Sequence, residues 1–132
     1  MWKLVTTDEY QRRHKRWLKD NSRELQAVLD NLDTYFKSLE AGVKPLQIKH
    51  GFMHNELMGV VAIDQKGGGK NLAQTRLYVY AETETETLYV ITLGDKQSQK
   101  DDIDTCRNVV TELRKAKQEQ EPKTDEEPKP TQ

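Results

Sequence analysis

The amino-acid sequence predicts an α+β domain, in which an N-terminal helical hairpin packs on a four-stranded, mainly antiparallel sheet and a final helix follows. Three observations predict this class. Apolar residues recur with the spacing of a helix through the first 40 residues. From Leu46 the apolar spacing changes to two, as in strands, and near the end of the chain the helical spacing returns. The predicted order is two helices, four strands and one helix, with the helices on one face of the sheet.

Two helices joined by a short link form the predicted hairpin. The first covers residues 7–20, because Thr6 and Glu9 have the spacing of a capping box. The second begins after Asn21 and ends near Gly42, since a left-handed residue often stops a helix. A short link between two helices favours an antiparallel return. The apolar stripe of the second helix consists of Leu25, Val28, Leu29, Leu32, Tyr35, Phe36 and Leu39.

Four segments with alternating or continuous apolar residues are predicted strands. They cover residues 46–52, 56–64, 73–81 and 87–93. The last of them is the most hydrophobic, so we expect it in the centre of the sheet. A final helix is predicted from Lys100 to Lys115. Its apolar stripe consists of Ile103, Cys106, Val109, Val110 and Leu113.

Composition limits the number of domains and the setting of the protein. The chain has 132 residues, of which one is cysteine and 33% are charged. Residues 117–132 hold three of the four prolines and no large apolar side chain. They are therefore predicted to be a disordered tail that follows a single domain over residues 1–116. No apolar run approaches the ~18 residues of a membrane span. The single cysteine excludes an internal disulfide framework, and we expect a cytoplasmic protein that does not contact membranes.

Charge is unevenly distributed along a chain whose formal net charge is −1. Residues 1–80 carry 13 basic and 9 acidic side chains, whereas residues 81–132 carry 8 and 13. The first part therefore offers the better surface for an anionic partner. The first predicted helix is especially basic, with Arg12, Arg13 and Arg16. These arginines form either a solvated face or a contact surface for a phosphate backbone.

Three further motifs have a structural and a functional interpretation. The glycines before Lys70 lack the spacing and the following Ser or Thr of a phosphate-binding loop, so they predict a hairpin loop. His50 and His54 have too few neighbouring ligand residues for a metal site. They are structural, or they act as a general acid or base near a sheet edge. Cys106 lies in an apolar stripe and is expected in the core.

Arg76 is the strongest candidate for a functional residue. It lies inside a predicted strand, on the same face as Tyr78 and Tyr80. An arginine on such a surface needs a carboxylate or an anionic ligand. Lys96 follows the neighbouring strand, and antiparallel pairing could bring it to the same rim of the sheet. Two converging cations suit phosphodiester cleavage without a metal, because they stabilise charge that develops on phosphoryl oxygens.

The two segments around these cations resemble the RelE/ParE superfamily of bacterial toxins, and in particular the RelE-like messenger-RNA interferases. The first segment is Thr75-Arg76-Leu77-Tyr78-Val79-Tyr80. The second is Tyr89-Val90-Ile91-Thr92-Leu93-Gly94-Asp95-Lys96. The family likewise has an arginine in a strand, then a hydrophobic strand that closes in a basic pair, then a helix. Its helical hairpin also precedes a four-stranded sheet.

The resemblance implies an endoribonuclease that needs no metal or other cofactor and acts on messenger RNA, either free or on the ribosome. Arg76 matches the strand arginine of the family, and Lys96 its second catalytic arginine. The catalytic tyrosine that the family has after its last strand has no counterpart, so His50 or His54 is the expected proton carrier. The expected RNA contacts are Lys49, Arg12, Arg13, Arg16, Tyr78 and Tyr80.

The resemblance also implies a cognate antitoxin protein that wraps the helices and the sheet. As an alternative, the chain has the fold of this family but is a catalytically inactive protein-binding module. The missing tyrosine, the near-zero net charge and the acidic stretch from Glu82 to Glu86 favour it. A third possibility is a ParE-like inhibitor of a protein target.

Overall fold

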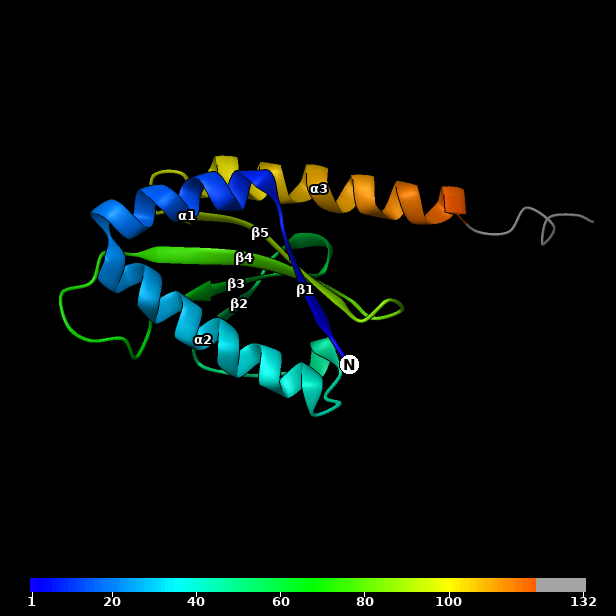
Figure 1. Ribbon diagram of the computed structural model, residues 1–132, viewed down its shortest axis with the longest axis horizontal. Coiled ribbons are helices and arrows are strands. Elements are labelled where there is room, and N and C mark those ends of the chain that lie inside the picture. Colours follow the sequence, from blue (N-terminus) through cyan, green and yellow to red (C-terminus); the bar gives the residue numbers. More distant parts are fainter. Residues whose placement is uncertain (121–132) are drawn as a thin grey trace, which may run out of the picture.

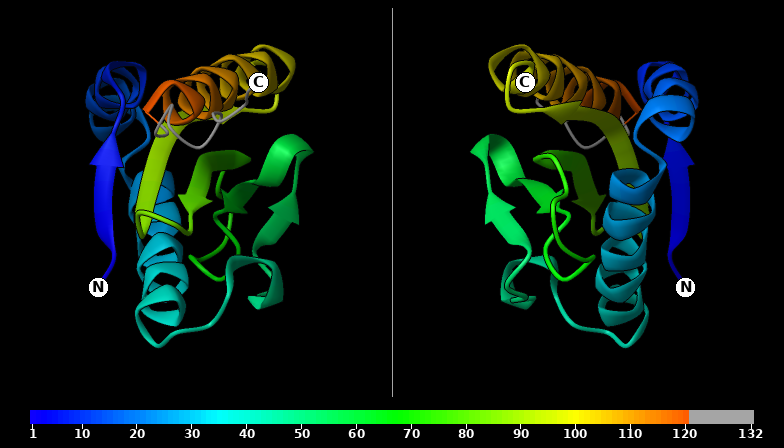
Figure 2. Two further views of the ribbon diagram at one scale, coloured as in Figure 1. Left: turned by 90° about the vertical axis from the view of Figure 1, so that its right-hand side faces the viewer. Right: turned by 90° about the vertical axis from the view of Figure 1, so that its left-hand side faces the viewer.

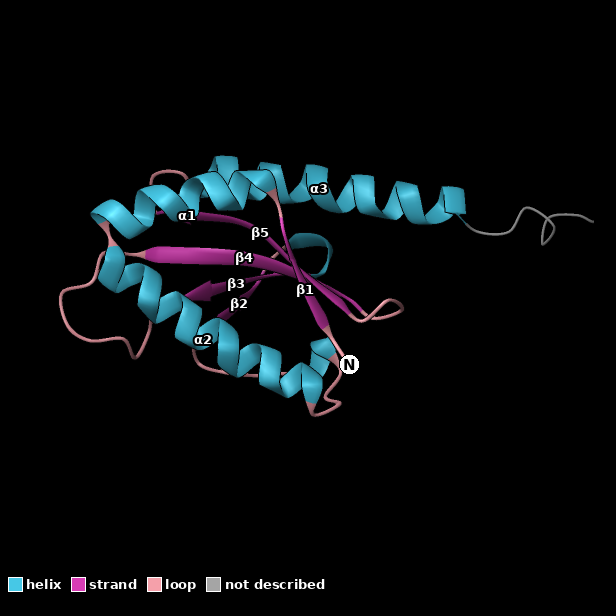
Figure 3. Cartoon of the chain, in the orientation of Figure 1, coloured by secondary structure: helices cyan, strands magenta, loops and turns pink. Residues whose placement is uncertain are grey.

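The computed structural model describes residues 1–120 and confirms the α+β class (Figures 1 and 3). Three α-helices and a five-stranded mixed sheet make up the domain. The helices are α1 (Asp8–Asp20), α2 (Ser22–Glu40) and α3 (Gln99–Gln120). The strands are β1 (Lys3–Thr6), β2 (Met53–Asn55), β3 (Val60–Asp64), β4 (Thr75–Glu82) and β5 (Thr87–Asp95). Two short 3₁₀ turns, η1 (Pro45–Gln47) and η2 (Leu57–Gly59), precede β2 and β3, respectively.

The sheet contains one strand that the sequence pattern did not predict. The strand order is β1-β5-β4-β3-β2, and all neighbours are antiparallel except β1 and β5, which are parallel. β1 has only four residues, and the side chains of Leu4 and Val5 remain partly exposed. A strand this short and this exposed has no clear apolar alternation. With β1 in place, β5 lies between two neighbours and is an interior strand, although β4 and not β5 is the central strand of the five.

The predicted helical hairpin is present, and its caps differ in detail from the prediction. The Oγ1 atom of Thr7, not of Thr6, accepts a hydrogen bond of 3.0 Å from the Tyr10 amide at the start of α1. Asn21 ends α1 and begins α2, but its side chain caps neither helix end. Gly42 has a φ of +91°, so the left-handed residue expected after α2 is there.

The first two predicted strands are the least accurate part of the sequence analysis. Residues 46–52 do not form a strand, because Pro45 begins η1 and the chain reaches the sheet only at Met53. Proline fixes φ and lacks the amide hydrogen that a sheet needs, which favours such a turn. The predicted strand 56–64 begins late, because η2 occupies its first half.

Helices cover both faces of the sheet, so the prediction that they lie on one face is wrong (Figure 2). The larger core joins α1 and α2 to one face and includes Trp17, Tyr35 and Leu77. The smaller core joins α3 to the other face through Tyr78, Cys106 and neighbouring residues. Alternate residues of β4 therefore enter different cores. α1 continues along β5 where β1 ends, because the Thr7 amide donates to the Val90 carbonyl at 3.1 Å.

The C-terminal helix is longer than predicted. α3 runs to Gln120, so residues 117–120, which were expected to begin the disordered tail, are helical. Lys117 forms an ion pair with Glu84 in the turn between β4 and β5, which fastens this end of the helix to the sheet. The rest of the predicted tail, 121–132, lies outside the described residues. Within residues 1–120, no helix combines the length and the apolar character needed to cross a membrane.

Candidate functional site

Arg76 lies on the face of β4 that α3 partly covers, and there it forms an ion pair with a carboxylate. Its Nη1 atom lies 3.6 Å from Oε2 of Glu56, which precedes η2. The side chains of Arg76 and Glu56 are 20% and 18% exposed. The Nε atom of Arg76 is buried and has no hydrogen-bond partner among the described residues. A long ion pair and an unsatisfied donor leave the guanidinium able to bind a further anion.

His54 and Asp64 form a second polar pair beside this arginine. His54 Nε2 lies 2.7 Å from Asp64 Oδ2, and the other carboxylate oxygen accepts the Lys66 amide hydrogen at 2.7 Å. Asp64 is directly opposite Arg76 in the register of β3 and β4. The pairs His54–Ala62 and Arg76–Asp64 place all three polar side chains on one face of the sheet. The His54 side chain is 38% exposed, and Nδ1 is the ring nitrogen that does not face Asp64.

The other predicted histidine lies elsewhere. His50 Nε2 lies 3.2 Å from Oγ of Ser38 in α2, and its ring stacks on Phe52 with centroids 5.0 Å apart. α2 and α3 cover opposite faces of the sheet, so His50 and Arg76 are on different sides of the domain. Of these two histidines, only His54 therefore shares a face of the sheet with Arg76, and β3 with Asp64 lies between them.

Lys49 and Lys96, the two lysines predicted to belong to the site, are both exposed. Lys96 lies in the turn that follows β5, and it forms no ion pair within the described residues. Gly94, two residues earlier, is directly opposite Arg76, so Lys96 is close in register to the arginine without contacting it. Lys49 lines a small surface pocket together with His50 and Met53. It therefore belongs to the region of His50, away from Arg76.

The three arginines of α1 have different surroundings. Arg12 is exposed and forms an ion pair with Glu9. Arg16 is also exposed, and its guanidinium carbon lies 5.3 Å from the centre of the Trp17 ring. Arg13 is largely buried, and it donates to the Leu93 carbonyl at 2.7 Å and to Asp102 at 3.2 Å. Arg13 is therefore a structural link between α1, β5 and α3, and not the RNA contact that was expected.

The two tyrosines that follow Arg76 along β4 also differ. Tyr78 is fully buried under α3, and its hydroxyl has no partner among the described residues. Burial raises the pKa of Tyr78 well above its usual range, and nearby Asp102 adds to this increase. A side chain that is closed off in this way cannot stack on RNA, so the predicted contact is wrong. Tyr80 is only half-buried, and its ring lines an open groove at the end of the strand.

Glu56 and Asp64 are the site residues that the sequence analysis missed. Neither residue belongs to a recognisable sequence motif. The pairing of β2, β3 and β4 places both of them in the site. Asp64 could have been found from the predicted hairpin, because it ends the strand that precedes Arg76 and faces it across a turn. Cys106 is in the core, as predicted, and burial raises the pKa of its thiol to about 12.

Taken together, the site presents a partly buried guanidinium, an open histidine oriented by a carboxylate, and a second carboxylate. This set can bind an anion and move a proton. Among residues 1–120, no group of three or more histidine, cysteine, aspartate or glutamate side chains is arranged to hold a metal ion. Comparison of the chain with protein-family models, with curated proteins and with solved structures found no match.

Proposed function

We propose that the chain is an endoribonuclease of the RelE/ParE toxin type, which cleaves messenger RNA by attack of the RNA's own 2′-hydroxyl. The observation that carries this proposal is the placement of Arg76 beside the His54–Asp64 pair on one face of the sheet. A cation for the phosphoryl group and a base for the hydroxyl are the two groups that such a cleavage needs. The helical hairpin that precedes the antiparallel strands is consistent with the family resemblance.

In the proposed reaction, His54 is the general base. Its Nε2 atom faces Asp64, so Nδ1 takes the proton from the 2′-hydroxyl. The 2′ oxygen then forms a bond to phosphorus, and the bond from phosphorus to the 5′ oxygen breaks. The 5′ oxygen takes up a proton from water, and His54 returns its proton to the solvent. The products are a 2′,3′-cyclic phosphate and a 5′-hydroxyl end.

Arg76 stabilises the negative charge that develops on the phosphoryl oxygens. Its ion pair with Glu56 at 3.6 Å is longer than an ordinary charge-assisted hydrogen bond, so a phosphate can compete for the guanidinium. Lys96 is exposed two residues beyond the position opposite Arg76, from which it can contact an adjacent phosphate. The exposed Arg12 and Arg16 on α1 supply further contacts to the RNA backbone or the ribosome.

The first experiment is induced expression in a bacterial host, with growth recorded and total RNA mapped by primer extension. We expect growth arrest and discrete cuts in translated messenger RNA. Arg76→Ala should reduce cleavage about 10²- to 10³-fold. Arg107→Ala is the matched control, because Arg107 is also paired with one carboxylate but lies on the outer surface of α3. Normal growth and intact RNA, with folded wild-type protein, would contradict the proposal.

A catalytically inactive protein-binding module is the second candidate, and one observation favours it. Arg76 already has a carboxylate partner, and two of the expected RNA contacts, Arg13 and Tyr78, are buried. In this case the physiological ligand is a protein of the antitoxin type, and the chain cleaves nothing. Purified protein incubated with messenger RNA, with and without ribosomes, separates the two candidates, because only the first predicts fragments with cyclic phosphate ends.

A further inference from the structure

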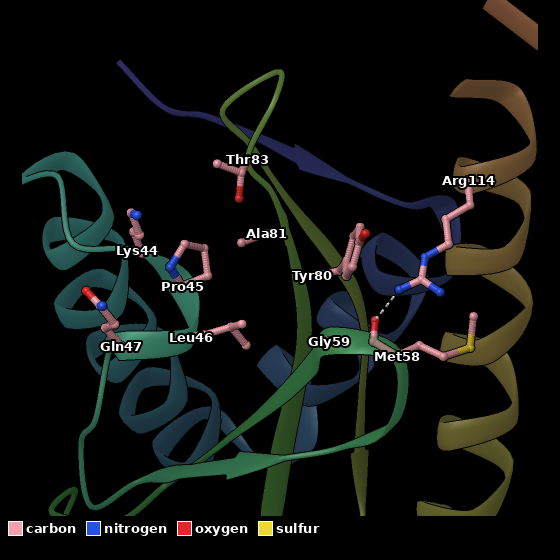
Figure 4. Close-up of a pocket in the computed structure, with 10 residues that line it drawn as sticks. All are labelled: Lys44, Pro45, Leu46, Gln47, Met58, Gly59, Tyr80, Ala81, Thr83 and Arg114. Atoms are coloured by element: carbon pink, nitrogen blue, oxygen red, sulfur yellow. Dashed lines mark hydrogen bonds between the residues drawn. The ribbon is translucent and has the colours of Figure 1, made fainter. Parts of the chain in front are cut away.

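A groove of about 550 Å³ lies at the end of β4 that is remote from Arg76 (Figure 4). Segments from both sides of the sheet form its walls. η1 forms one wall, and η2 together with Arg114 of α3 forms the other. Tyr80, Ala81 and Thr83 of the β4 end lie between these walls. The groove thus has the exposed end of a strand as its floor.

The backbone of η2 explains why this strand end is uncovered. Met58 and Gly59 are consecutive residues with left-handed φ values of +56° and +83°. A left-handed conformation is unfavourable for methionine, and it is held here by a hydrogen bond of 2.8 Å from the Glu56 amide to the Val60 carbonyl. Because of this turn, β3 begins only at Val60, opposite Tyr80. Past Tyr80, β4 pairs with β5 alone, so its other edge has no strand partner within residues 1–120.

The side chains around this edge are apolar, with a cationic rim. Leu46 projects from η1 and is 89% exposed, which is unusual for a leucine. The ring of Tyr80 lies across the groove from Leu46, whereas the side chain of Met58 extends towards α3 (Figure 4). Among residues 1–120, the charged side chains that line the groove are Lys44 and Arg114, one on each wall. Arg114 is fixed there because its guanidinium donates to the Met58 carbonyl at 3.1 Å.

The groove is separate from the candidate catalytic site. Arg76 and Tyr80 share one face of β4, but Tyr78 between them is fully buried under α3. The contact from Arg114 to Met58 closes the same face. A nucleic-acid strand therefore has no continuous path from Arg76 to Tyr80, and a single pair of cations is a weak electrostatic surface for RNA. A protein ligand suits this groove better.

We propose that the groove binds an acidic, extended segment of a partner protein, which adds to the free edge of β4 as a further strand. The backbone of the segment pairs with the unpaired edge past Tyr80. One large aliphatic side chain of the segment packs between Leu46 and Tyr80, and flanking carboxylates pair with Lys44 and Arg114. Each feature of the groove then has a partner: the strand edge, the exposed leucine and the two cations.

A second copy of the chain is a poorer occupant than an acidic segment. Symmetric pairing of two β4 edges would bring the Lys44 and Arg114 rims of both copies towards each other. Like charges placed opposite each other across a strand pair are destabilising. An acidic segment instead neutralises both cations. The proposal does not depend on the endoribonuclease activity, so its test is independent of that activity.

The test uses fluorescence anisotropy with the full chain and two labelled peptides. The probe is Ser-Glu-Leu-Asp-Val-Glu-Leu-Asp-Ser, in which acidic and aliphatic residues alternate. In the control peptide, lysine replaces each acidic residue. We expect saturable binding of the acidic probe and at least about tenfold weaker binding of the basic peptide. Absence of saturable binding of the acidic probe, or equal binding of both peptides, would overturn the proposal.

Substitutions in the groove locate the binding site. Leu46→Ser should weaken binding of the acidic probe about tenfold or more, because a leucine contact of this size is lost. Leu18→Ser is the matched control, since Leu18 is 59% exposed on α1, away from the groove. Arg114→Glu should also weaken binding, whereas Arg107→Glu on the same helix should not. Both exposed leucines can change without disturbing the core, so a loss of folding should not obscure the result.

Further measurements distinguish an acidic segment from the other two possible occupants of the groove, a second copy of the chain and RNA. Amide exchange should slow at Ala81 or Glu82 when the probe binds, because the free strand edge then acquires partners. If Leu46→Ser instead abolishes a concentration-dependent dimer of the chain alone, the occupant is a second copy and the proposal is wrong. If a single-stranded RNA oligonucleotide displaces the probe and Leu46→Ser weakens the RNA equally, the groove is a nucleic-acid site and the proposal is also wrong.

Discussion

The guanidinium of Arg13, in α1, lies 3.2 Å from the carboxylate of Asp102, in the first turn of α3. Their side chains are 18% and 1% exposed, so this ion pair is largely removed from water. Asp102 also accepts a hydrogen bond of 2.7 Å from the Ser98 hydroxyl. The pair connects the helical hairpin on one side of the sheet to the helix on the other. It is therefore a structural link of the kind that only tertiary structure reveals.

Truncation of this arginine should destabilise the domain. Arg13→Ala leaves the buried Asp102 carboxylate with the Ser98 hydroxyl as its remaining donor, and it removes the donor to the Leu93 carbonyl. Loss of one partner from a buried ion pair costs about 3–5 kcal/mol, and part of this cost is offset if water reaches the site. Arg12→Ala is the control, because Arg12 is exposed and its pairing with Glu9 is a surface contact. Chemical denaturation of both variants checks the prediction, and equal stability of the two would contradict it.

The same carboxylate predicts an unusual pH dependence. Burial raises the pKa of Asp102 above its ordinary value of 3.8, although Ser98 and Arg13 oppose the increase. A raised folded-state pKa means that the folded protein binds this proton more tightly. The contribution of Asp102 to stability is therefore greatest below 3.8 and declines as the pH rises through the folded pKa. Asparagine does not titrate, so the free energy of unfolding of Asp102→Asn relative to wild type should be higher at pH 7 than at pH 3.5. Urea denaturation at the two pH values measures it, and a difference of opposite sign would refute the assignment.

Gly94, in β5, lies directly against the start of α3. A Cβ atom there would collide with the side chains of Asp102 and Ser98, which belong to the first turn of α3 and the residue before it. Gly94→Ala should therefore displace the start of α3 and destabilise the domain by about 1–3 kcal/mol. Gly51→Ala should have little effect, because the nearest atom to a Cβ there is the flexible end of Lys66 at 3.5 Å. Thermal unfolding of the two variants tests the contrast.

The sequence predicted elements whose apolar pattern is long and local. The stripe of α2 and the alternation of β4 and β5 are of this kind, and each was located to within about two residues. β1 was missed because its four residues gain their structure from a parallel partner that is distant in the sequence. Residues 46–52 were misassigned because the alternation outweighed the turn-forming effect of Pro45.

The candidate site could be predicted only in part, for a related reason. Arg76 was found because an arginine within a strand is costly unless it has a partner. Its actual partner, Glu56, and its cross-strand neighbour, Asp64, depend on the register of three strands, which the sequence does not specify. The same register decides which histidine is near Arg76. Exposure was likewise not predictable for Arg13 and Tyr78, because the packing of α3 buries both.

Two histidines that the sequence could not distinguish should now differ in function. If the proposed chemistry holds, His54→Asn should lower RNA cleavage by about 10²- to 10⁴-fold, because the general base is lost. Asp64→Asn should lower it less, since the base remains and only its orientation is weakened. His50→Asn should leave cleavage near the wild-type rate, as His50 contacts Ser38 and Phe52 on the α2 side. Single-turnover cleavage rates provide the measurement. A greater loss with His50→Asn than with His54→Asn would show that the base is wrongly assigned.

Tyr78 and Tyr10 allow a matched test of one buried hydroxyl against another. The Tyr78 hydroxyl is buried and lacks a hydrogen-bond partner within the described part of the chain, whereas the Tyr10 hydroxyl lies 2.8 Å from Nδ1 of His14. An unsatisfied buried hydroxyl costs free energy, so its removal in Tyr78→Phe should leave stability unchanged or raise it by about 1 kcal/mol. Tyr10→Phe should instead lower stability by about 1 kcal/mol, because a hydrogen bond is lost. The free energies of unfolding in urea give both values. Since Tyr78 is also closed off from any RNA, Tyr78→Phe should leave cleavage unaltered, and a large loss of activity in a stable Tyr78→Phe protein would mean that its hydroxyl reaches the substrate after all.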